Sequence, residues 1–180
     1  MSKTLVIYNI FSLGRNPDFF MRNGVDDSPD VDYIFVSNNK LIDYDSTWLG
    51  LWSRPNVEYY TRENTGYDYA AYSYALFKSK RGYRRILEEY DFFIFINESV
   101  LGPLLPSWWN RQKDLHWTSL FTSLINDQVK LGGTHINYYK GLPHVQGHMF
   151  VTDKIGLDIG IKNRIFENSV RVRTKEDVIS

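Results

Sequence analysis

The sequence of 180 residues contains no cysteine. This absence excludes disulfide bonds, thiolate zinc sites and cysteine nucleophiles, and it fits a reducing compartment, so we expect a cytoplasmic protein. No apolar run is long enough for a membrane-spanning segment, and the first one, at residues 4–11, is also too short for a signal sequence. An excess of one charge sign is missing too, because Lys and Arg number 21 and Asp and Glu number 21. Without a global positive field, we expect no nucleic-acid or membrane partner, but a small ligand.

Aromatic residues, by contrast, are abundant: they make up 16% of the chain and include 13 tyrosines and 5 tryptophans. A core seldom demands so many amphipathic rings, so stacking on sugar faces is one explanation and plain packing is the other. A length of 180 residues suits one domain with one core. We therefore expect a single domain over residues 1–180.

Six segments have the β-branched, aromatic and apolar composition of strands. They are Thr4–Phe11, Asp32–Asn38, Val57–Arg62, Phe92–Ile96, Val129–Asn137 and Val145–Thr152. From Tyr67 to Tyr90, apolar residues recur at a spacing of about 3.6, which predicts an amphipathic helix that is either continuous or broken near Gly82. Residues Trp108–Ile125 and Lys154–Phe166 are also expected to be helical.

The order of these elements predicts the fold class. A strand, the long helix and the apolar strand Phe92–Ile96 follow one another, which predicts a right-handed parallel crossover. A strand without polar alternation indicates burial on both of its faces. We therefore expect an α/β fold, with a mainly parallel twisted sheet and helices on both faces. Ligands of such folds bind at the carboxyl ends of the strands.

One candidate binding segment, Asn64-Thr-Gly-Tyr-Asp68, precedes the long helix. Gly66 would let the backbone turn tightly and approach a ligand, while the free N–H groups of the new helix would face phosphate or sugar oxygens. The alternative is a cap, with Asn64 or Thr65 as the N-cap residue and Asp68 complementing the helix dipole. Because capping and binding are compatible, both interpretations stay open.

A second candidate segment is Asn97-Glu98-Ser99, at the tip of the apolar strand. Nucleotide-sugar transferases of the GT-A type carry Asp-x-Asp at this place, two carboxylates that hold a divalent cation against the diphosphate. The cation stabilises the charge that develops on the nucleotide diphosphate as it leaves. Here Glu98 supplies one carboxylate. Literal Asp-x-Asp sequences at Asp30-Val-Asp32 and Asp43-Tyr-Asp45 follow no buried strand, so we interpret them as acids of surface loops or strand edges.

A third candidate segment is His144-Val-Gln-Gly-His148. On one strand, residues i and i+4 point to the same face, so the two histidines would lie together. Each could ligate a metal or bind a phosphate, although a lone histidine is more often a hydrogen-bonded structural group. Gly147 inside a strand marks the close approach of a ligand or of another backbone. That interpretation places Gln146 beside a sugar.

Five blocks of the sequence together resemble a known group of enzymes. They are Asn64–Tyr72, Phe95–Pro103, Trp117–Phe121, Val129–Asn137 and Pro143–Asp153. Through these ordered blocks, which span about residues 60–155, the chain resembles the rhamnan-synthesis-protein-F-like glycosyltransferases and is similar to the transferase domain of chlorella viruses. The resemblance implies a GT-A-like (Rossmann-like) domain that uses a nucleotide-diphosphate sugar, such as a rhamnose donor, to build a cell-surface or capsid glycan. Family proteins can be longer, so this chain could be a catalytic domain excised from a larger polypeptide.

Our hypothesis is therefore a glycosyltransferase that moves rhamnose or another hexose from a nucleotide-diphosphate donor to a hydroxyl of a glycan acceptor. A divalent cation, Mn²⁺ or Mg²⁺, would assist. The expected roles are as follows: Tyr8, Asn9 and Asn38 hold the base and ribose; Asn64, Gly66, Asp68, Asn97 and Gly147 contact the donor; Glu98 and His148 hold the metal; and Asp68 and Gln146 act at the reacting centre.

The general base of an inverting reaction stays open, because Asp68, Asp127 and Glu98 are all candidates. Two other functions also stay open. A nucleotidyltransferase would share the sheet and the metal, but Ser12-Leu-Gly-Arg-Asn16 is a poor version of its triphosphate loop. A non-catalytic carbohydrate- or protein-binding module would explain the aromatic residues and the missing second carboxylate.

Overall fold

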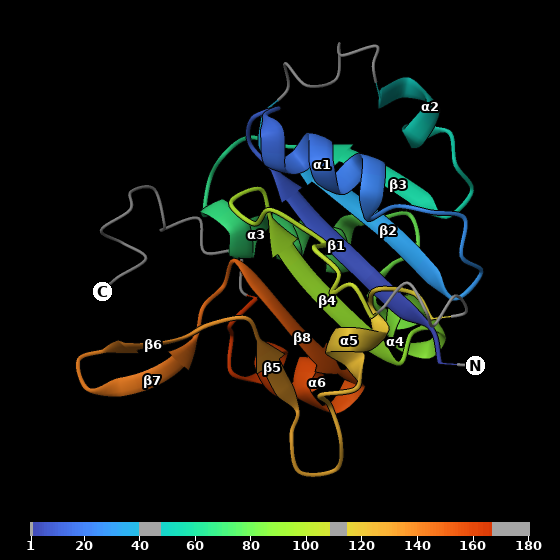
Figure 1. Cartoon of the computed structure of the whole chain (residues 1–180). Coiled ribbons are helices and arrows are strands. Elements are labelled where there is room, and N and C mark those ends of the chain that lie inside the picture. Colours follow the sequence, from blue (N-terminus) through green and yellow to red (C-terminus); the bar gives the residue numbers. More distant parts are fainter. Residues whose placement is uncertain (1, 40–47, 109–114, 167–180) are drawn as a thin grey trace.

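A twisted six-stranded sheet runs through the middle of the protein (Figure 1). The structure is a computed structural model that describes residues 2–39, 48–108 and 115–166. In spatial order the strands are β3 (Val57–Thr61), β2 (Val31–Ser37), β1 (Thr4–Ile10), β4 (Phe92–Asn97), β8 (Met149–Asp153) and β5 (Leu131–Gly133). The first four are parallel, whereas β8 runs antiparallel to both β4 and β5. The expected α/β class is confirmed, with a mixed sheet that is mostly parallel.

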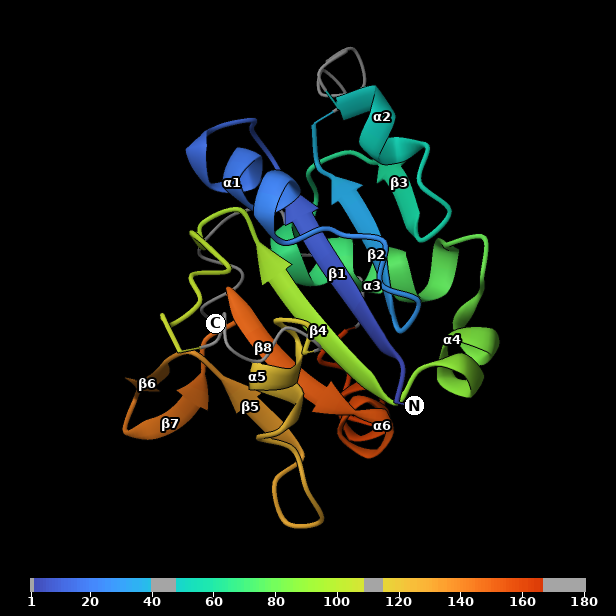
Figure 2. The same ribbon diagram turned by 45° about the vertical axis from the view of Figure 1, so that its right-hand side comes forward.

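Helices cover both faces of this sheet, as expected (Figure 2). One face carries α1 (Arg15–Asn23), α2 (Leu49–Trp52) and α5 (Ser119–Thr122). The other face carries α3 (Tyr67–Lys78), α4 (Tyr83–Glu89) and α6 (Lys154–Lys162). The predicted helix 67–90 is thus two helices, and the break lies at Gly82, whose φ of 70° few other residues adopt.

Two hydrophobic clusters, one on each face, explain why the strands lack polar alternation. Along β1, Val6 and Tyr8 face the α1 side, while Leu5 and Ile7 face the α3 side. Because both sides of a parallel sheet are covered, nearly every position of its strands is apolar. Many of the aromatic rings belong to these clusters. Among the largest fully buried side chains are Tyr8, Tyr33, Tyr72, Tyr90, Phe20, Phe35, Phe93 and Phe95.

The connections place a topological switch point between β1 and β4. From β1 the chain passes through α1 to β2 and then to β3, moving in one direction across the sheet. From β3 it returns through α3 and α4 on the opposite face and adds β4 on the far side of β1. In open α/β sheets, ligands bind outside the carboxyl ends of the two strands that flank such a point.

The C-terminal third differs from the sequence-based expectation. The predicted strand Val145–Thr152 is confirmed at Val145 and at residues 149–152 and is wrong between them, because β7 (Leu142–Val145) ends before Gln146 and β8 begins only at Met149. The predicted strand Val129–Asn137 is likewise divided between β5 and β6 (Ile136–Tyr139). Positive φ angles at Lys140 (49°) and Gly141 (79°) form a two-residue turn that pairs β6 with β7 as a separate hairpin.

The predicted helix Trp108–Ile125 is also wrong over most of its described part, where only α5 is an α-helix. Just before α5, Nδ1 of His116 accepts a hydrogen bond from the N–H of Thr118 at 3.2 Å. This side-chain bond competes with the helical backbone pattern, so the helix starts later. The acids of Asp43-Tyr-Asp45 lie outside the described residues.

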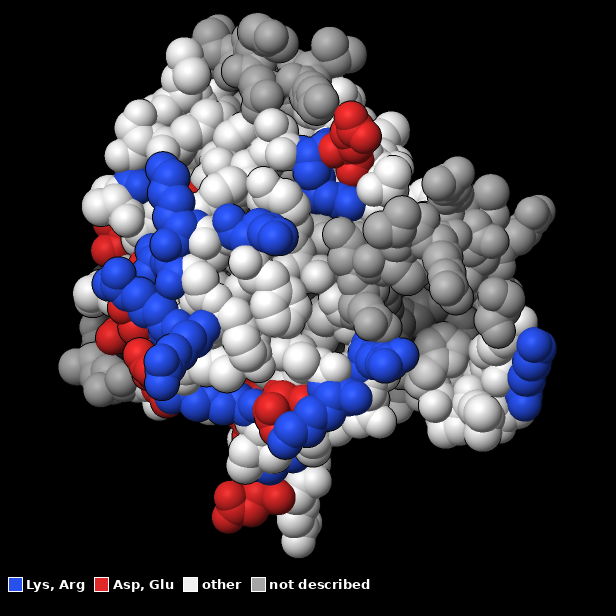
Figure 3. All heavy atoms as spheres, turned by 180° about the vertical axis from the view of Figure 1, so that it is seen from behind, with Lys and Arg blue, Asp and Glu red and all other residues white. Residues whose placement is uncertain are grey.

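Lys and Arg side chains gather along the margin of the face that carries α3, α4 and α6 (Figure 3). On α4 they form pairs with acids one turn away, Arg84 with Glu88 and Arg85 with Glu89. Such exposed pairs contribute little stability. No helix in the described part of the chain is long and apolar enough to cross a membrane.

Candidate functional site

A row of polar side chains follows the carboxyl edge of the four parallel strands. Arg62 comes directly after β3, Asn38 after β2, Asn9 lies near the end of β1, and Asn97 ends β4. Because the strands are parallel and adjacent, these side chains occupy one edge of the sheet. Asn9 and Asn97 are register partners, one on each side of the switch point.

Asp68 joins the two central asparagines. Its carboxylate accepts one hydrogen bond from Nδ2 of Asn9 and one from Nδ2 of Asn97, both at 2.6 Å. The remaining acceptor of the cluster, Oδ1 of Asn9, is buried and has no hydrogen-bond partner among the described residues. An acceptor in that state is costly unless a donor from a ligand or water reaches it. The cluster of Asn9, Asp68 and Asn97 therefore is the centre of the candidate site.

Burial raises the pKa of Asp68 above its ordinary value of 3.8. The hydrogen bonds from Asn97 and Asn9 and the nearby His148 lower this pKa, and the negative charge of Glu98 raises it, but desolvation has the largest effect. A carboxylate whose pKa moves towards neutral pH is a better proton acceptor. Asp68 is therefore the acid of this edge best suited to general-base chemistry.

This pKa shift predicts a pH dependence of stability. Because the folded state binds the Asp68 proton more tightly than the unfolded chain, the contribution of Asp68 to stability is most favourable below pH 3.8. It declines as the pH rises to the higher folded-state pKa and is constant above that. We expect the free energy of unfolding of the native protein to fall relative to that of Asp68→Asn across this window. Urea unfolding of both proteins from about pH 3 to pH 8 measures it, and parallel curves contradict the shift.

The chain turns tightly at Gly66 before α3, as the sequence predicts, but no side chain caps the helix there. Gly66 is the N-cap residue with φ of 74°, and it makes no side-chain capping bond. The capping interpretation with Asn64 or Thr65 is therefore wrong, and Asp68 points to the two asparagines. Tyr67 also has a positive φ, of 50°. Asn64 is exposed beside this left-handed turn, so its predicted donor contact stays a prediction.

Arg62 is a candidate site residue that none of the sequence motifs indicates. Its guanidinium donates to Oδ1 of Asn38 at 2.7 Å and to the backbone oxygen of Thr65 at 2.5 Å. Only 8% of the residue is exposed, and no carboxylate of the described residues pairs with it. An arginine keeps its charge in a protein, so this buried cation suits an anionic ligand group. A basic residue at the end of a strand is the sequence signal that could have identified it.

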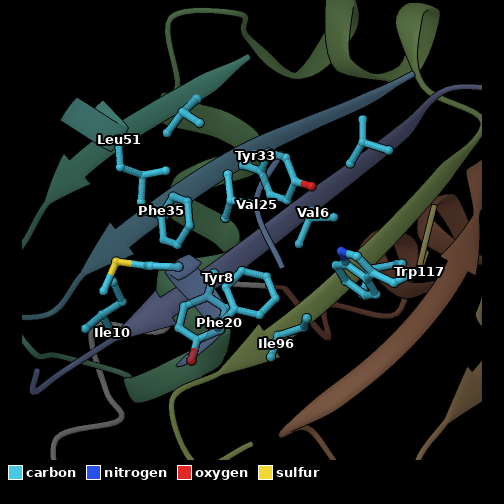
Figure 4. Close-up of a cluster of buried hydrophobic side chains, with 14 of the residues drawn as sticks. Val6, Tyr8, Ile10, Phe20, Val25, Tyr33, Phe35, Leu51, Ile96 and Trp117 are labelled. Atoms are coloured by element: carbon cyan, nitrogen blue, oxygen red, sulfur yellow. The ribbon is translucent and has the colours of Figure 1, made fainter. Parts of the chain in front are cut away.

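Tyr8 is not at the surface of the site. Its ring is 1% exposed and stacks on Phe20, with ring centroids 4.3 Å apart, inside the cluster on the α1 face (Figure 4). Burial, with a smaller effect of Glu98, raises the pKa of its hydroxyl. Tyr8 therefore has a packing role in this structure, and its predicted contact with base or ribose stays a prediction.

Glu98 is hydrogen-bonded to the loop that follows β1. Its Oε2 accepts hydrogen bonds from the backbone N–H groups of Phe11 and Ser12, both at 2.6 Å. Charge-assisted bonds of this kind hold a loop firmly. The described residues contain no group of three His, Cys, Asp or Glu side chains that could hold a metal ion. The predicted metal site of Glu98 with His148 stays a prediction.

His148 lies in the turn before β8, at the same edge as Asn97, whose N–H donates to the His148 oxygen at 2.9 Å. Its ring contacts His135 and Thr134. Desolvation, followed by the neighbouring His135, lowers the pKa of His148. His144 lies on β7 instead, so the expectation that the two histidines share a strand is wrong. Gln146 lies in the same turn and donates its N–H to the oxygen of His135.

The close neighbour of Gly147 is a side chain, that of Tyr69, and not another backbone segment. A Cβ at this position would lie 2.9 Å from Cε2 and from the hydroxyl oxygen of Tyr69. The expected position on a buried strand is wrong, because Gly147 belongs to the turn between β7 and β8. The carbonyl of Gly147 also accepts a hydrogen bond from the hydroxyl of Tyr72 at 3.3 Å. Packing against α3 therefore explains the glycine, and its contact with a donor stays a prediction.

We expect Gly147→Ala to destabilise the protein by about 1–3 kcal/mol, because the added methyl group must displace the Tyr69 ring. Gly50→Ala is the matched control, since a Cβ at Gly50 meets no atom within 4 Å and Gly50 lies in α2. Chemical denaturation of both variants measures the effect. Equal midpoints for Gly147→Ala and the native protein would show that Tyr69 moves without cost.

Two acids lie away from this edge. Asp127 is exposed in the loop before β5, and Leu131 of β5 is paired through Thr152 with Phe93, near the start of β4. This loop therefore lies at the opposite edge of the sheet, which removes Asp127 as a candidate base. Asp32 is also at that edge, near the start of β2, so of its two expected positions the surface loop is wrong. It is buried and pairs with Lys3 at 2.8 Å and Arg81 at 3.1 Å.

A separate cavity of about 600 Å³ lies between the hairpin, β8 and α6. Its walls include Tyr69, Val145, Phe150, Ile159 and Phe166. The lining is mostly apolar, so it offers few hydrogen-bond partners for sugar hydroxyls. The polar edge at the switch point remains the candidate site.

The fold and this edge define the class: an α/β protein with a polar candidate site at the carboxyl ends of its parallel strands. Comparison with known families gives the more particular finding. The model of the rhamnan synthesis protein F family matches residues 33–113. This span includes Asn38, Arg62, Asp68 and Asn97, and it supports a relation to polysaccharide synthesis. No curated protein and no solved structure matches the chain.

Proposed function

We propose that the protein is a glycosyltransferase of polysaccharide synthesis, with a GT-A-like domain that takes a nucleotide-diphosphate sugar as donor. The observation that carries this proposal is the cluster of Asn9, Asp68 and Asn97 at the topological switch point. This is where α/β folds bind nucleotides. The family match over residues 33–113 supports a role in polysaccharide synthesis, because rhamnan is a polysaccharide.

The proposed chemistry assigns a role to each part of the edge. Asp68 takes the proton from a hydroxyl of the glycan acceptor as this oxygen attacks the anomeric carbon of the donor. The bond from that carbon to the diphosphate breaks, and the nucleoside diphosphate leaves with the electron pair of this bond, so it carries one negative charge more than it had in the donor. Arg62 is the buried cation near the ends of β2 and β3 that would attract this anion. A divalent cation would supply further stabilisation.

Two observations bear on the other candidate functions. The N–H groups of Phe11 and Ser12 already bind the carboxylate of Glu98, so this loop is unsuited to the triphosphate of a nucleotidyltransferase. A non-catalytic carbohydrate-binding module is favoured by the lack of a cluster of three metal-ligating acids, histidines or cysteines among the described residues. Donor hydrolysis separates an enzyme from such a module.

A screen of UDP-, GDP- and TDP-sugars with and without Mn²⁺ tests the proposal. A donor that binds the native state raises the unfolding temperature, by an amount that grows with its concentration relative to Kd. We expect one nucleotide series to stabilise the protein and its sugar to be released slowly to water. If none of the donors shifts the unfolding temperature, the transferase proposal fails. Stabilisation by a free glycan without donor hydrolysis supports the binding module.

A further inference from the structure

Three side-chain atoms beside the turn of residues 146–148 form a nearly equilateral triangle. Nδ1 of His135 lies 3.0 Å from Nε2 of His148, and Oγ1 of Thr134 lies 3.1 Å from each of these nitrogens. Thr134 and His135 connect β5 to the hairpin, while His148 precedes β8. Two segments of chain thus bring two imidazole nitrogens and one hydroxyl oxygen to one point.

The size of this triangle matches one face of an octahedron around a metal ion. In an octahedral site, adjacent ligand atoms are separated by the metal–ligand distance multiplied by √2. Separations of 3.0–3.1 Å then correspond to metal–ligand distances of about 2.1–2.2 Å, which are ordinary for divalent ions bound by nitrogen and oxygen. A tetrahedral ion would need distances of only about 1.9 Å, shorter than zinc–imidazole bonds.

We propose that Thr134, His135 and His148 form a binding site for a divalent transition-metal ion, with three protein ligands on one face and the opposite face open. Imidazole ligands favour such ions over Mg²⁺ and Ca²⁺, which prefer oxygen ligands. Hydroxyl groups of threonine also coordinate divalent ions. The site differs from the expected pair of Glu98 and His148, since Glu98 belongs to the loop after β1.

The charge around this site indicates what the open face would hold. The three ligands are neutral, so a bound ion would keep its two positive charges. The open positions would therefore attract water or an anionic group. If the proposed transferase activity holds, the diphosphate of the donor is a suitable anion, but the metal site does not depend on that activity.

A hydrogen bond between the two imidazoles is the competing explanation, because a protonated nitrogen of one ring can donate to the bare nitrogen of the other. The two explanations differ in what they require. Metal binding needs both facing nitrogens without a proton and responds to loss of either ring. A hydrogen-bonded pair gives no saturable affinity for ions.

Calorimetric titration of the full chain with Zn²⁺, Co²⁺ and Mn²⁺, without any nucleotide, tests the site directly. We expect one ion per chain to bind and Co²⁺ to give a visible absorption band. His135→Ala and His148→Ala should each weaken binding by about tenfold or more, and Thr134→Val should weaken it less. The matched control is His144→Ala, on the adjoining hairpin and outside the triangle.

His135 is exposed and its side chain touches no core cluster, so the His135→Ala variant should fold normally, which its unfolding temperature checks. Absence of saturable binding up to about 1 mM of each ion would overturn the proposal, as this corresponds to less than about 4 kcal/mol of binding free energy. Equal weakening by His144→Ala and His135→Ala would overturn it as well, because it would indicate unspecific surface binding. The result is independent of whether a sugar donor binds.

Discussion

We expect the Asp68→Asn variant to lose about 10²–10⁴-fold in the turnover of sugar transfer while keeping its fold. The amide cannot accept the acceptor proton. It can, however, preserve the hydrogen-bonded cluster: its oxygen accepts from Asn97, and its nitrogen donates to Asn9 after the Asn9 amide rotates. That rotation uses Oδ1 of Asn9, which otherwise has no partner among the described residues.

The measurement is turnover per folded molecule, with the folded fraction taken from an unfolding curve of the same preparation. Asp158→Asn is the matched control, since Asp158 is an exposed acid on α6 that pairs only one turn away with Lys162. Full turnover by Asp68→Asn, together with a much lower unfolding temperature, would show that Asp68 is structural and would remove it from the catalytic role.

We expect Asp32→Ala to destabilise the protein by about 3–5 kcal/mol, the range found when one partner of a buried ion pair is removed. Asp32 binds Lys3, Arg81 and the hydroxyl of Tyr90, so its loss removes the buried acid that these three groups share. Of its ion pairs, Arg81 then keeps those with Glu58 and Glu89. The loss of Asp32 should leave turnover per folded molecule unchanged, because this acid lies at the opposite edge of the sheet from Asp68.

Urea unfolding at neutral pH measures this change. Asp158→Ala is again the comparison, and its exposed pair with Lys162 should contribute no more than about 1 kcal/mol. A loss of similar size in the two variants would show that the ion pairs of Asp32 are as weak as those of the surface. A metal-dependent loss of turnover in Asp32→Ala would instead revive the Asp-x-Asp interpretation of residues 30–32.

The parallel half of the fold could be predicted because its signals are local. Continuous apolar runs such as Phe92–Ile96 indicate strands covered on both faces, and the 3.6 spacing after Tyr67 indicates the helix between them. Order along the chain then gives parallel crossovers, and parallel strands bring their carboxyl ends to one edge. This logic placed Asn9, Asn38, Asp68 and Asn97 together in one candidate site.

The other half depended on contacts between distant segments. The hairpin of β6 and β7 requires left-handed backbone at Lys140 and Gly141. Lys-Gly is a weaker turn signal than Asn-Gly. Without that turn, the sequence of residues 129–152 suggests two long strands in place of four short ones. The proximity of His135 to His148 follows from this hairpin, so no spacing rule could have paired them. Likewise, the burial of Asp32 depends on Lys3 and Arg81, which lie far from it in sequence.

The antiparallel strand β8 also determines how the protein can be divided. It pairs with β4 from Phe92 to Ile96, whereas the family match ends at residue 113, before β8. A fragment cut there would expose the unpaired N–H and C=O groups of a long apolar strand, which is a template for aggregation. In the intact chain the outer strand on this side is β5, only three residues long and with two glycines, a poor template for further pairing. We therefore expect soluble expression to require the segment that carries β8, even though the match to the family model ends before it.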